Sequence, residues 1–225
     1  MRTGLVIAVA LGAAVVGGLT GAWLADATGV LEQTTRTVTV AGPSDPATEP
    51  LPLLGNGFDP ASLYARRAGG VVTIYADLGA DGQSQGSGFV VDGEGTILTN
   101  AHVITNVAVG SSDVRGAQTV FVELRDGDRV RASIVGWDLF NDVGVVRIDP
   151  ADHDVQPVPL GDSSRVRVGE PVAAIGSPFG NQSSLAVGVV SATGRSIDSL
   201  TSGYAVADAI QIDAPINRGN SGGPL

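Results

Sequence analysis

The chain has 225 residues and a formal net charge of −10, because 23 acidic residues outnumber 13 basic ones. All of the basic residues are Arg and they form no cluster, which argues against nucleic-acid binding as the main task. The sequence contains no Cys, which excludes disulfides, Cys-ligated metal sites and a thiol nucleophile. We expect neither a cofactor nor a metal ion.

The N-terminus carries an uncharged apolar run from Gly4 to Ala25. At ~1.5 Å per residue this run can cross a ~30 Å hydrocarbon core, so residues 1–25 are predicted to form a transmembrane anchor. Arg2 on the inner side then places the rest of a single-pass cell-membrane protein outside the cytoplasm. A small-x-small site ending at Ala27 keeps open the alternative of a cleaved signal segment and a secreted protein.

Residues 26–60 are polar and then rich in proline. Proline at this density favours extended backbone, so the segment is predicted to be a semi-rigid linker without a core of its own. A short helix is expected to follow the linker, at about Ala61 to Ala68.

Short segments rich in β-branched residues and separated by Gly/Asp turns then follow, which is typical of an all-β fold. Within residues 61–150, a first barrel is predicted from the segments 71–76, 88–91, 96–99, 119–124, 129–135 and 143–148. Residues 151–225 begin with a Pro-containing crossover. They continue with the predicted strands 171–176, 185–191 and 209–213, which indicates a second barrel that is incomplete.

The segment 217–225, which we call the serine loop, places Ser221 among Gly219, Gly222 and Gly223. Glycines allow a tight turn and leave backbone amides unobstructed, as a nucleophilic serine beside an oxyanion-binding pocket requires. A serine hydroxyl is a weak nucleophile unless a base accepts its proton. Ser221 is therefore a candidate nucleophile that needs a histidine and a carboxylate from elsewhere in the chain.

His102 follows the predicted strand 96–99, where an imidazole can reach into a cleft. The other histidine, His153, lies among acidic residues in the crossover and is interpreted as a solvated loop residue. Asp142 directly precedes a predicted strand and can accept a hydrogen bond from the far ring nitrogen of a catalytic histidine. Asp138 is the competing candidate for this role.

The order His102, Asp142, Ser221 is that of the two-barrel trypsin-like fold. Longer motifs make the resemblance specific. They are Thr-Asn-Ala-His-Val (99–103), Asn-Asp-Val-Gly-Val-Val (141–146), Ala-Ile-Gly-Ser-Pro-Phe-Gly (174–180), Gly-Val-Val-Ser-Ala-Thr-Gly-Arg (188–195) and Gln-Ile-Asp-Ala-Pro-Ile-Asn-Arg-Gly-Asn-Ser-Gly-Gly-Pro-Leu (211–225). In order and spacing, these motifs closely resemble the HtrA/Deg family of serine proteases, and the match covers the chain from about Ala61 to its end.

The resemblance implies two six-stranded antiparallel barrels with a catalytic site between them. It implies that Ser221 is the nucleophile, His102 the general base and Asp142 the orienting acid, with the amides of Gly219 and Ser221 binding the oxyanion. Pro215 lies where trypsin-like enzymes that cut after Arg or Lys place an aspartate at the pocket base. Because a buried cationic side chain would stay uncompensated there, we expect cleavage after small or medium aliphatic residues.

The resemblance also implies a biological role. Members of this family degrade unfolded or damaged extracytoplasmic proteins and switch their activity by ordering loops, for which 177–184 and 197–205 are the candidates here. Trimers are the habit of the family, and a homotrimer would use residues near Ala61.

The sequence departs from the family after Ser221, where two further strands and a PDZ domain would follow. We therefore expect residues 211–213 to hold the serine loop on one side only. Activity is expected to be at least about a hundredfold below that of a chain extended by the two closing strands. A catalytically impaired binding or chaperone-like module is accordingly an alternative function. A third alternative is an esterase using Ser84 in the Gly-x-Ser-x-Gly pattern at 82–86, which is disfavoured because a strand, not a helix, is predicted to follow.

Overall fold

The structure of the protein, a computed structural model, describes residues 57–109, 113–177, 183–198 and 205–225. The predicted membrane anchor and nearly all of the predicted linker lie outside these ranges, as do the central parts of both candidate switching loops. Within the described ranges, no helix is long and apolar enough to cross a membrane.

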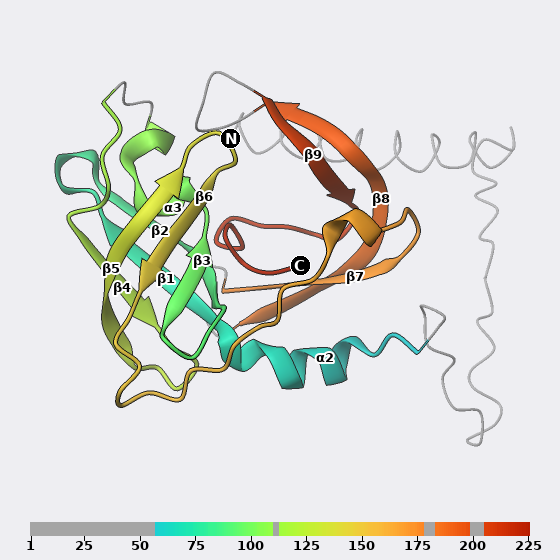
Figure 1. The fold of residues 1–225 in the computed structure, drawn as a ribbon, viewed down its shortest axis with the longest axis horizontal. Coiled ribbons are helices and arrows are strands. Elements are labelled where there is room, and N and C mark those ends of the chain that lie inside the picture. The colour runs from blue at the N-terminus through green and yellow to red at the C-terminus, as the bar shows by residue number, and fades with distance from the viewer. Residues whose placement is uncertain (1–56, 110–112, 178–182, 199–204) are drawn as a thin grey trace, which may run out of the picture. The chain divides into compact units, whose positions relative to one another are not determined.

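Six strands form a closed antiparallel barrel (Figure 1). They are β1 (Val71–Asp77), β2 (Gln83–Val90), β3 (Thr96–Thr99), β4 (Thr119–Glu123), β5 (Arg129–Asp138) and β6 (Val143–Arg147). Their order around the barrel is β1-β2-β3-β6-β5-β4, and pairing of β1 with β4 closes it. The prediction of an all-β fold with a first six-stranded barrel is confirmed.

The barrel interior is filled by aliphatic side chains from alternate strand positions. On β1, Val72, Ile74 and Ala76 are at most 2% exposed and belong to one buried cluster. The same cluster includes Val103 and Ile104 of the one-turn helix α3 (Ala101–Ile104). Fully burying such side chains is worth roughly 1.5–3 kcal/mol each, so α3 is anchored firmly to the barrel. The fold thereby fixes the backbone on which His102 is carried.

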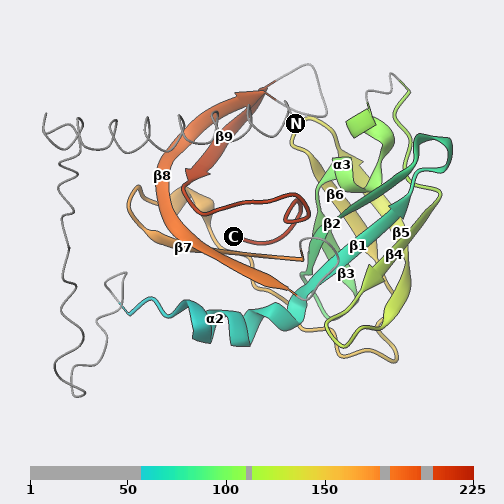
Figure 2. The same cartoon turned by 180° about the vertical axis from the view of Figure 1, so that it is seen from behind.

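A second, three-stranded antiparallel sheet consists of β7 (Pro171–Gly176), β8 (Ser184–Asp198) and β9 (Ala205–Ile212), in that order. Strand β7 has the predicted bounds. Strand β8 continues beyond the predicted 185–191 because irregularities in its register with β9 let the two strands stay paired along a strong curve (Figures 1 and 2). Among the described residues this sheet is open, so the closed second barrel expected of the family is not seen there.

Helix α2 (Pro60–Arg67) and the start of β1 join the sheet to the barrel. The helix, predicted at about Ala61 to Ala68, lies one residue earlier. Asp59 caps it by accepting from the Ser62 amide at 3.0 Å, and proline occupies the first turn. After α2, Ala68 and Val71 form a small buried cluster with Ile175 of β7. The second sheet is therefore held against the barrel by apolar packing at the base of β1.

Candidate active site

Two hydrogen bonds join His102 to Asp142. The Nδ1 atom of His102 lies 2.7 Å from Oδ2 of Asp142, and the backbone amide of His102 donates to Oδ1 at 3.0 Å. The two side chains are only 18% and 17% exposed. A carboxylate can only accept, so this contact places the imidazole proton on Nδ1 and leaves the lone pair on Nε2. The arrangement suits His102 to accept a proton on Nε2.

The backbone of Asp142 is held in an uncommon conformation. Its φ is +52°, in the left-handed region that few non-glycine residues adopt. Its carbonyl oxygen accepts from the side-chain amide of Asn100 at 2.7 Å and from the Ala101 backbone amide at 3.2 Å. Asn100 and the first turn of α3 thus donate to both the carbonyl and the carboxylate of the aspartate, which fixes the carboxylate opposite the imidazole.

Asp138, the competing candidate, has a different role. Its Oδ1 accepts from the Phe140 amide at 2.8 Å, and its Oδ2 accepts from the Asn141 side chain at 2.6 Å. These hydrogen bonds, above all the one from Asn141, lower the pKa of Asp138 from its ordinary value. Asp138 therefore shapes the turn between β5 and β6 that presents Asp142, and it is Asp142 that contacts the histidine.

The serine loop is attached to both sheets. On the barrel side, the Ser87 amide donates to the carbonyl oxygen of Ser221 at 2.7 Å, and the Ser87 hydroxyl donates to that of Gly219 at 2.6 Å. On the other side, the Ile175 amide of β7 donates to the carbonyl oxygen of Pro224 at 3.1 Å. The expectation that only one side of this loop is held is therefore wrong, because strands β2 and β7 both bind it.

Gly222 marks where the serine loop meets the residues before His102. Its φ is +85°, and a β-carbon built on it would lie 2.4 Å from Thr99 Oγ1 and 3.0 Å from the Asn100 amide nitrogen. Only glycine fits so close an approach at this φ. The residue next to Ser221 thus contacts the end of β3, and His102 follows only a few positions further along the chain. The structure brings the three predicted residues into one region.

Among the described residues, the turn around Ser221 leaves the backbone amides of Gly219, Ser221 and Gly222 without a hydrogen bond, and the first two flank Asn220. The Asn220 amide donates to Asn217 at 3.1 Å, and the Gly223 amide donates to Asn220 at 2.9 Å. In the part of the chain that the structure describes, the amides of Gly219 and Ser221 donate to no protein group. Gly219 has a φ of +96°, which an L side chain rarely adopts. Two unpaired amides beside a serine are suited to bind a developing oxyanion.

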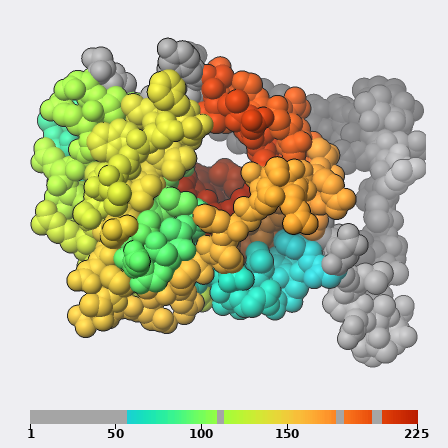
Figure 3. All heavy atoms as spheres, in the orientation of Figure 1, coloured from blue at the N-terminus to red at the C-terminus, as the bar shows by residue number. Residues whose placement is uncertain are grey.

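A hollow separates the β5–β6 side of the barrel from β8 and β9 (Figure 3). The dark red C-terminal segment, which includes the serine loop, lies at its floor in that view and between the barrel and β8 in both ribbon views (Figures 1 and 2). Pro215, the predicted pocket residue, is exposed. Its neighbour Asp213 is already engaged, since its Oδ1 accepts from the Val189 amide at 2.6 Å.

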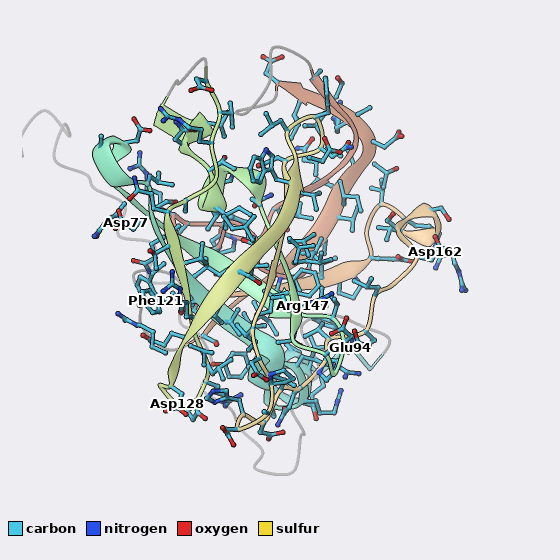
Figure 4. All side chains as sticks on the ribbon, turned by 60° about the vertical axis from the view of Figure 1, so that its left-hand side comes forward. Asp77, Glu94, Phe121, Asp128, Arg147 and Asp162 are labelled. Carbon is cyan, nitrogen blue, oxygen red and sulfur yellow. The ribbon has the colours of Figure 1, made fainter. Side chains whose placement is uncertain are left out.

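Two other sequence candidates lie outside this region. Ser84 is in a strand, paired with Ala76 of β1, so the strand-to-helix elbow of an esterase is wrong. His153 does lie in a loop, but its side chain is only 19% exposed, and its Nδ1 is 3.5 Å from Oδ2 of Asp128 near the turn between β4 and β5 (Figure 4). Its interpretation as solvated is therefore wrong. No group of acidic or histidine side chains in the described ranges is placed to hold a metal ion.

Sequence reasoning missed Ser87 and Asn100. Asn100 lies inside the Thr-Asn-Ala-His-Val motif, so its position beside His102 was a usable signal. Ser87 lies in Gly-Ser-Gly on β2, where small residues indicate close backbone approach. Nothing in the sequence indicated that the approaching backbone is the serine loop, because that contact joins residues far apart in the chain.

Residues 86–225 match the family described as "Trypsin-like peptidase domain". The chain is 46% identical over 143 residues to "Protease Do-like 1, chloroplastic" of Arabidopsis thaliana, covering 64% of this chain and 30% of that protein. It is 44% identical over 143 residues to a "Probable periplasmic serine endoprotease DegP-like" of Pseudomonas savastanoi pv. phaseolicola, covering 64% and 26%. The chain thus spans less than half the length of these relatives.

Solved structures of HtrA-type and Deg proteases also resemble this chain. The crystal structure of Deg5 is 40% identical, with a TM-score of 0.60, and the match covers 73% of this chain and 77% of that one. The HtrA-type protease AlgW, solved with a tripeptide, is 37% identical with a TM-score of 0.62, covering 74% and 50%.

Proposed function

This chain belongs to the trypsin-like peptidase family and within it to the HtrA/Deg type, and from that premise we propose that it is a serine endopeptidase acting through an acyl-enzyme. The nucleophile is Ser221, the general base His102 and the orienting acid Asp142. The amides of Gly219 and Ser221 form the oxyanion hole. The organisation proposed for the chain is an anchor at 1–25, a linker at 26–60, a first barrel at 61–150 and a second barrel at 151–225.

In the first step, the Ser221 hydroxyl oxygen attacks the peptide carbonyl carbon while its proton passes to Nε2 of His102. The oxyanion that forms accepts from the two amides of the serine loop. The protonated His102, stabilised by Asp142, then gives the proton to the leaving amine, and the carbon–nitrogen bond breaks to leave an ester on Ser221. Water, deprotonated by the same imidazole, hydrolyses that ester and restores the serine.

The observation that carries this proposal is the 2.7 Å contact between His102 and Asp142. His102 lies three residues after Thr99, the last residue of β3, against which Gly222 of the serine loop packs. If Asp142 were only a turn residue and His102 only a packing residue, hydrogen bonds from both the ring and the backbone amide of His102 to one carboxylate would not be expected. The proposal further requires that the base, the acid and the nucleophile act on one substrate bond, and the contact of Gly222 with Thr99 and Asn100 supports this.

A fluorophosphonate probe and casein test the proposal on the full chain. Wild type is expected to be labelled and to cleave casein, while Ser221→Ala and His102→Ala lose both activities and Ser84→Ala keeps them. Labelling of Ser221→Ala at the wild-type rate would overturn the proposal. A wild-type chain that suppresses aggregation of a client protein but is neither labelled nor cleaves casein would instead establish the binding-module alternative.

The proposed specificity is cleavage after small or medium aliphatic residues such as Val, Ala or Ile. Pro215 offers no charge at the pocket base, and the carboxylate of Asp213 is occupied by the β8 backbone. A cationic substrate side chain would therefore lose hydration without gaining a partner. A peptide-library profile dominated by Arg and Lys at the cleaved position would contradict this specificity.

For the cellular role, we propose a single-pass membrane protein whose protease part lies outside the cytoplasm, or a protein secreted after cleavage near Ala27. The substrates are unfolded or damaged proteins, and the assembly is a homotrimer built through residues near Ala61. Support comes from the apolar run at 4–25 and from relatives named as periplasmic or chloroplastic proteases. Fractionation of cells expressing the full chain, followed by size-exclusion chromatography with light scattering, tests both the location and the assembly.

A further inference from the structure

We infer that Ser87 is a positioning residue for the oxyanion hole, an inference that rests on the proposed serine-protease function. Ser87 lies on β2 and is 0% exposed. It does not reach the reacting atoms. It acts instead on the backbone of the serine loop, through a hydroxyl that nothing in the proposed chemistry otherwise uses.

All polar groups of Ser87 are engaged. Its amide donates to the carbonyl oxygen of Ser221 at 2.7 Å, and its hydroxyl donates to that of Gly219 at 2.6 Å. Its own carbonyl accepts from the Thr99 hydroxyl at 2.7 Å, and its hydroxyl oxygen accepts from the Ser177 amide at 2.8 Å. Ser87 thus donates to two carbonyls of the serine loop, those of Gly219 and Ser221, which flank Asn220.

Gly219 needs this external support. Glycine has no β-carbon to restrict its φ and ψ, and the φ of +96° seen here is one of several backbone conformations open to it. Its amide can serve as an oxyanion donor only in orientations that point into the hollow. A hydrogen bond from a fully buried hydroxyl to the Gly219 carbonyl fixes one end of the residue, so the amide at the other end is pre-set before substrate arrives.

The hydroxyl of Ser87 also belongs to a buried polar seam. The seam consists of Thr73, Ser177 and Ser87, which are 5%, 3% and 0% exposed, and it ends at the Gly219 carbonyl. Thr73 donates to Ser177 Oγ at 2.5 Å, and among the described residues it makes no hydrogen bond to the serine loop. Ser87 and Thr73 are therefore two buried hydroxyl residues of one seam, and of these two only Ser87 is hydrogen-bonded to the serine loop. A substitution of Thr73 is accordingly a matched control for one of Ser87.

The test measures fluorophosphonate labelling of the full chain as a function of probe concentration and pH, with thermal denaturation of each variant. Ser87→Ala is expected to lower the maximal labelling rate about tenfold to a hundredfold, somewhat less than deleting an oxyanion donor outright. The half-saturating probe concentration should stay within about twofold, and the pH of half-maximal rate should not move, because His102 and Asp142 are untouched. Ser87→Cys, a weaker donor of similar size, should fall between wild type and Ser87→Ala.

Thr73→Val is the burial-matched control and Ser84→Ala the control on the same strand. Both should label within about twofold of wild type, although Thr73→Val loses thermal stability. Equal labelling rates for Ser87→Ala and wild type, or equal losses in Ser87→Ala and Thr73→Val, would reduce Ser87 to a structural residue. If Ser87→Ala does not fold, a wild-type rate in Ser87→Cys overturns the inference equally. Failure of wild type itself to be labelled would overturn the proposed function and this inference together.

Discussion

The side-chain amide of Asn100 donates to the backbone carbonyl oxygen of Asp142 at 2.7 Å, and this bond supports a left-handed aspartate opposite His102. Replacing Asn100 by Ala removes one hydrogen bond but leaves the carbonyl its bond from the Ala101 amide, so we expect a cost of about 0.5–1.5 kcal/mol. We expect Asn100→Ala to lower the melting temperature and to slow fluorophosphonate labelling about tenfold. Asn100→Asp, which cannot donate, should behave similarly, and an unchanged labelling rate in both variants would show that Asp142 needs no such support.

Asp142→Asn should nearly abolish activity while leaving the fold intact. Asparagine tolerates a positive φ, so the turn is retained. Its amide group, however, donates toward Nδ1 of His102 and forces the proton onto Nε2, where the ring can no longer accept from Ser221. A loss of about ten-thousandfold in casein cleavage is expected, by analogy with trypsin-like enzymes generally. Asp138→Asn is the control and should stay within about threefold; equal losses in both variants would mean that the carboxylates act only on the turn.

The pKa of Asp138 is lowered by hydrogen bonds from the Asn141 side chain and the Phe140 amide, which gives its contribution to stability a definite pH dependence. A carboxyl group with a lowered folded-state pKa stabilises the fold above its unfolded pKa of about 3.9, and this contribution is lost as pH falls through the folded value. The difference in melting temperature between wild type and Asp138→Asn should therefore be constant above about pH 5 and shrink below about pH 4. Thermal melts of both proteins from about pH 2 to about pH 7 measure it, and a gap that widens in acid would reverse the assignment.

Much of the fold followed from the sequence because the strands are short, β-branched and separated by Gly/Asp turns. The predicted segments 96–99 and 171–176 coincide with β3 and β7. The larger errors are at β2, which begins at Gln83, before the predicted 88, and at β8, which continues to Asp198. Strand β9 also begins earlier than predicted, at Ala205 instead of 209, and β5 continues to Asp138 instead of 135. The extensions of β2 and β8 are polar or Gly-rich, and they form strands only because a partner strand supplies the hydrogen bonds, which local propensity does not contain.

The site was predictable to the level of motifs and no further. The motif around His102 and the order of the three residues led to the HtrA/Deg resemblance, which the comparisons confirm. From the residues themselves, either Asp138 or Asp142 could have been a turn aspartate, and it was the resemblance that pointed to Asp142. The structure adds the physical reason, a left-handed turn that aligns the Asp142 carboxylate with the imidazole. The pinning of the serine loop by Ser87 and by Ile175 was also out of reach, since it joins strands far apart in sequence.

The distribution of buried contacts predicts how the two sheets exchange amide hydrogens. The main buried cluster lies in the barrel, whereas β8 beyond Val190 is exposed or half-buried and irregularly paired with β9. Few buried apolar contacts mean a low free energy of local opening. Amides in β1, β4 and β6 should therefore exchange most slowly, and those at 192–198 much faster.

Amide hydrogen exchange also tests whether the serine loop is docked on β2 and β7. The amides of Ser87 and Ile175 donate to the carbonyls of Ser221 and Pro224, so both should be protected only while the loop is docked. In Ser87→Ala the loss of the Gly219 contact should speed amide exchange within the serine loop and leave β4 unchanged. Hydrogen-exchange NMR or mass spectrometry on the full chain resolves these segments. Uniform protection across both sheets would contradict the predicted difference between them. An Ile175 amide that exchanges as fast as residues 192–198 would show that the loop is not held by the two strands in solution.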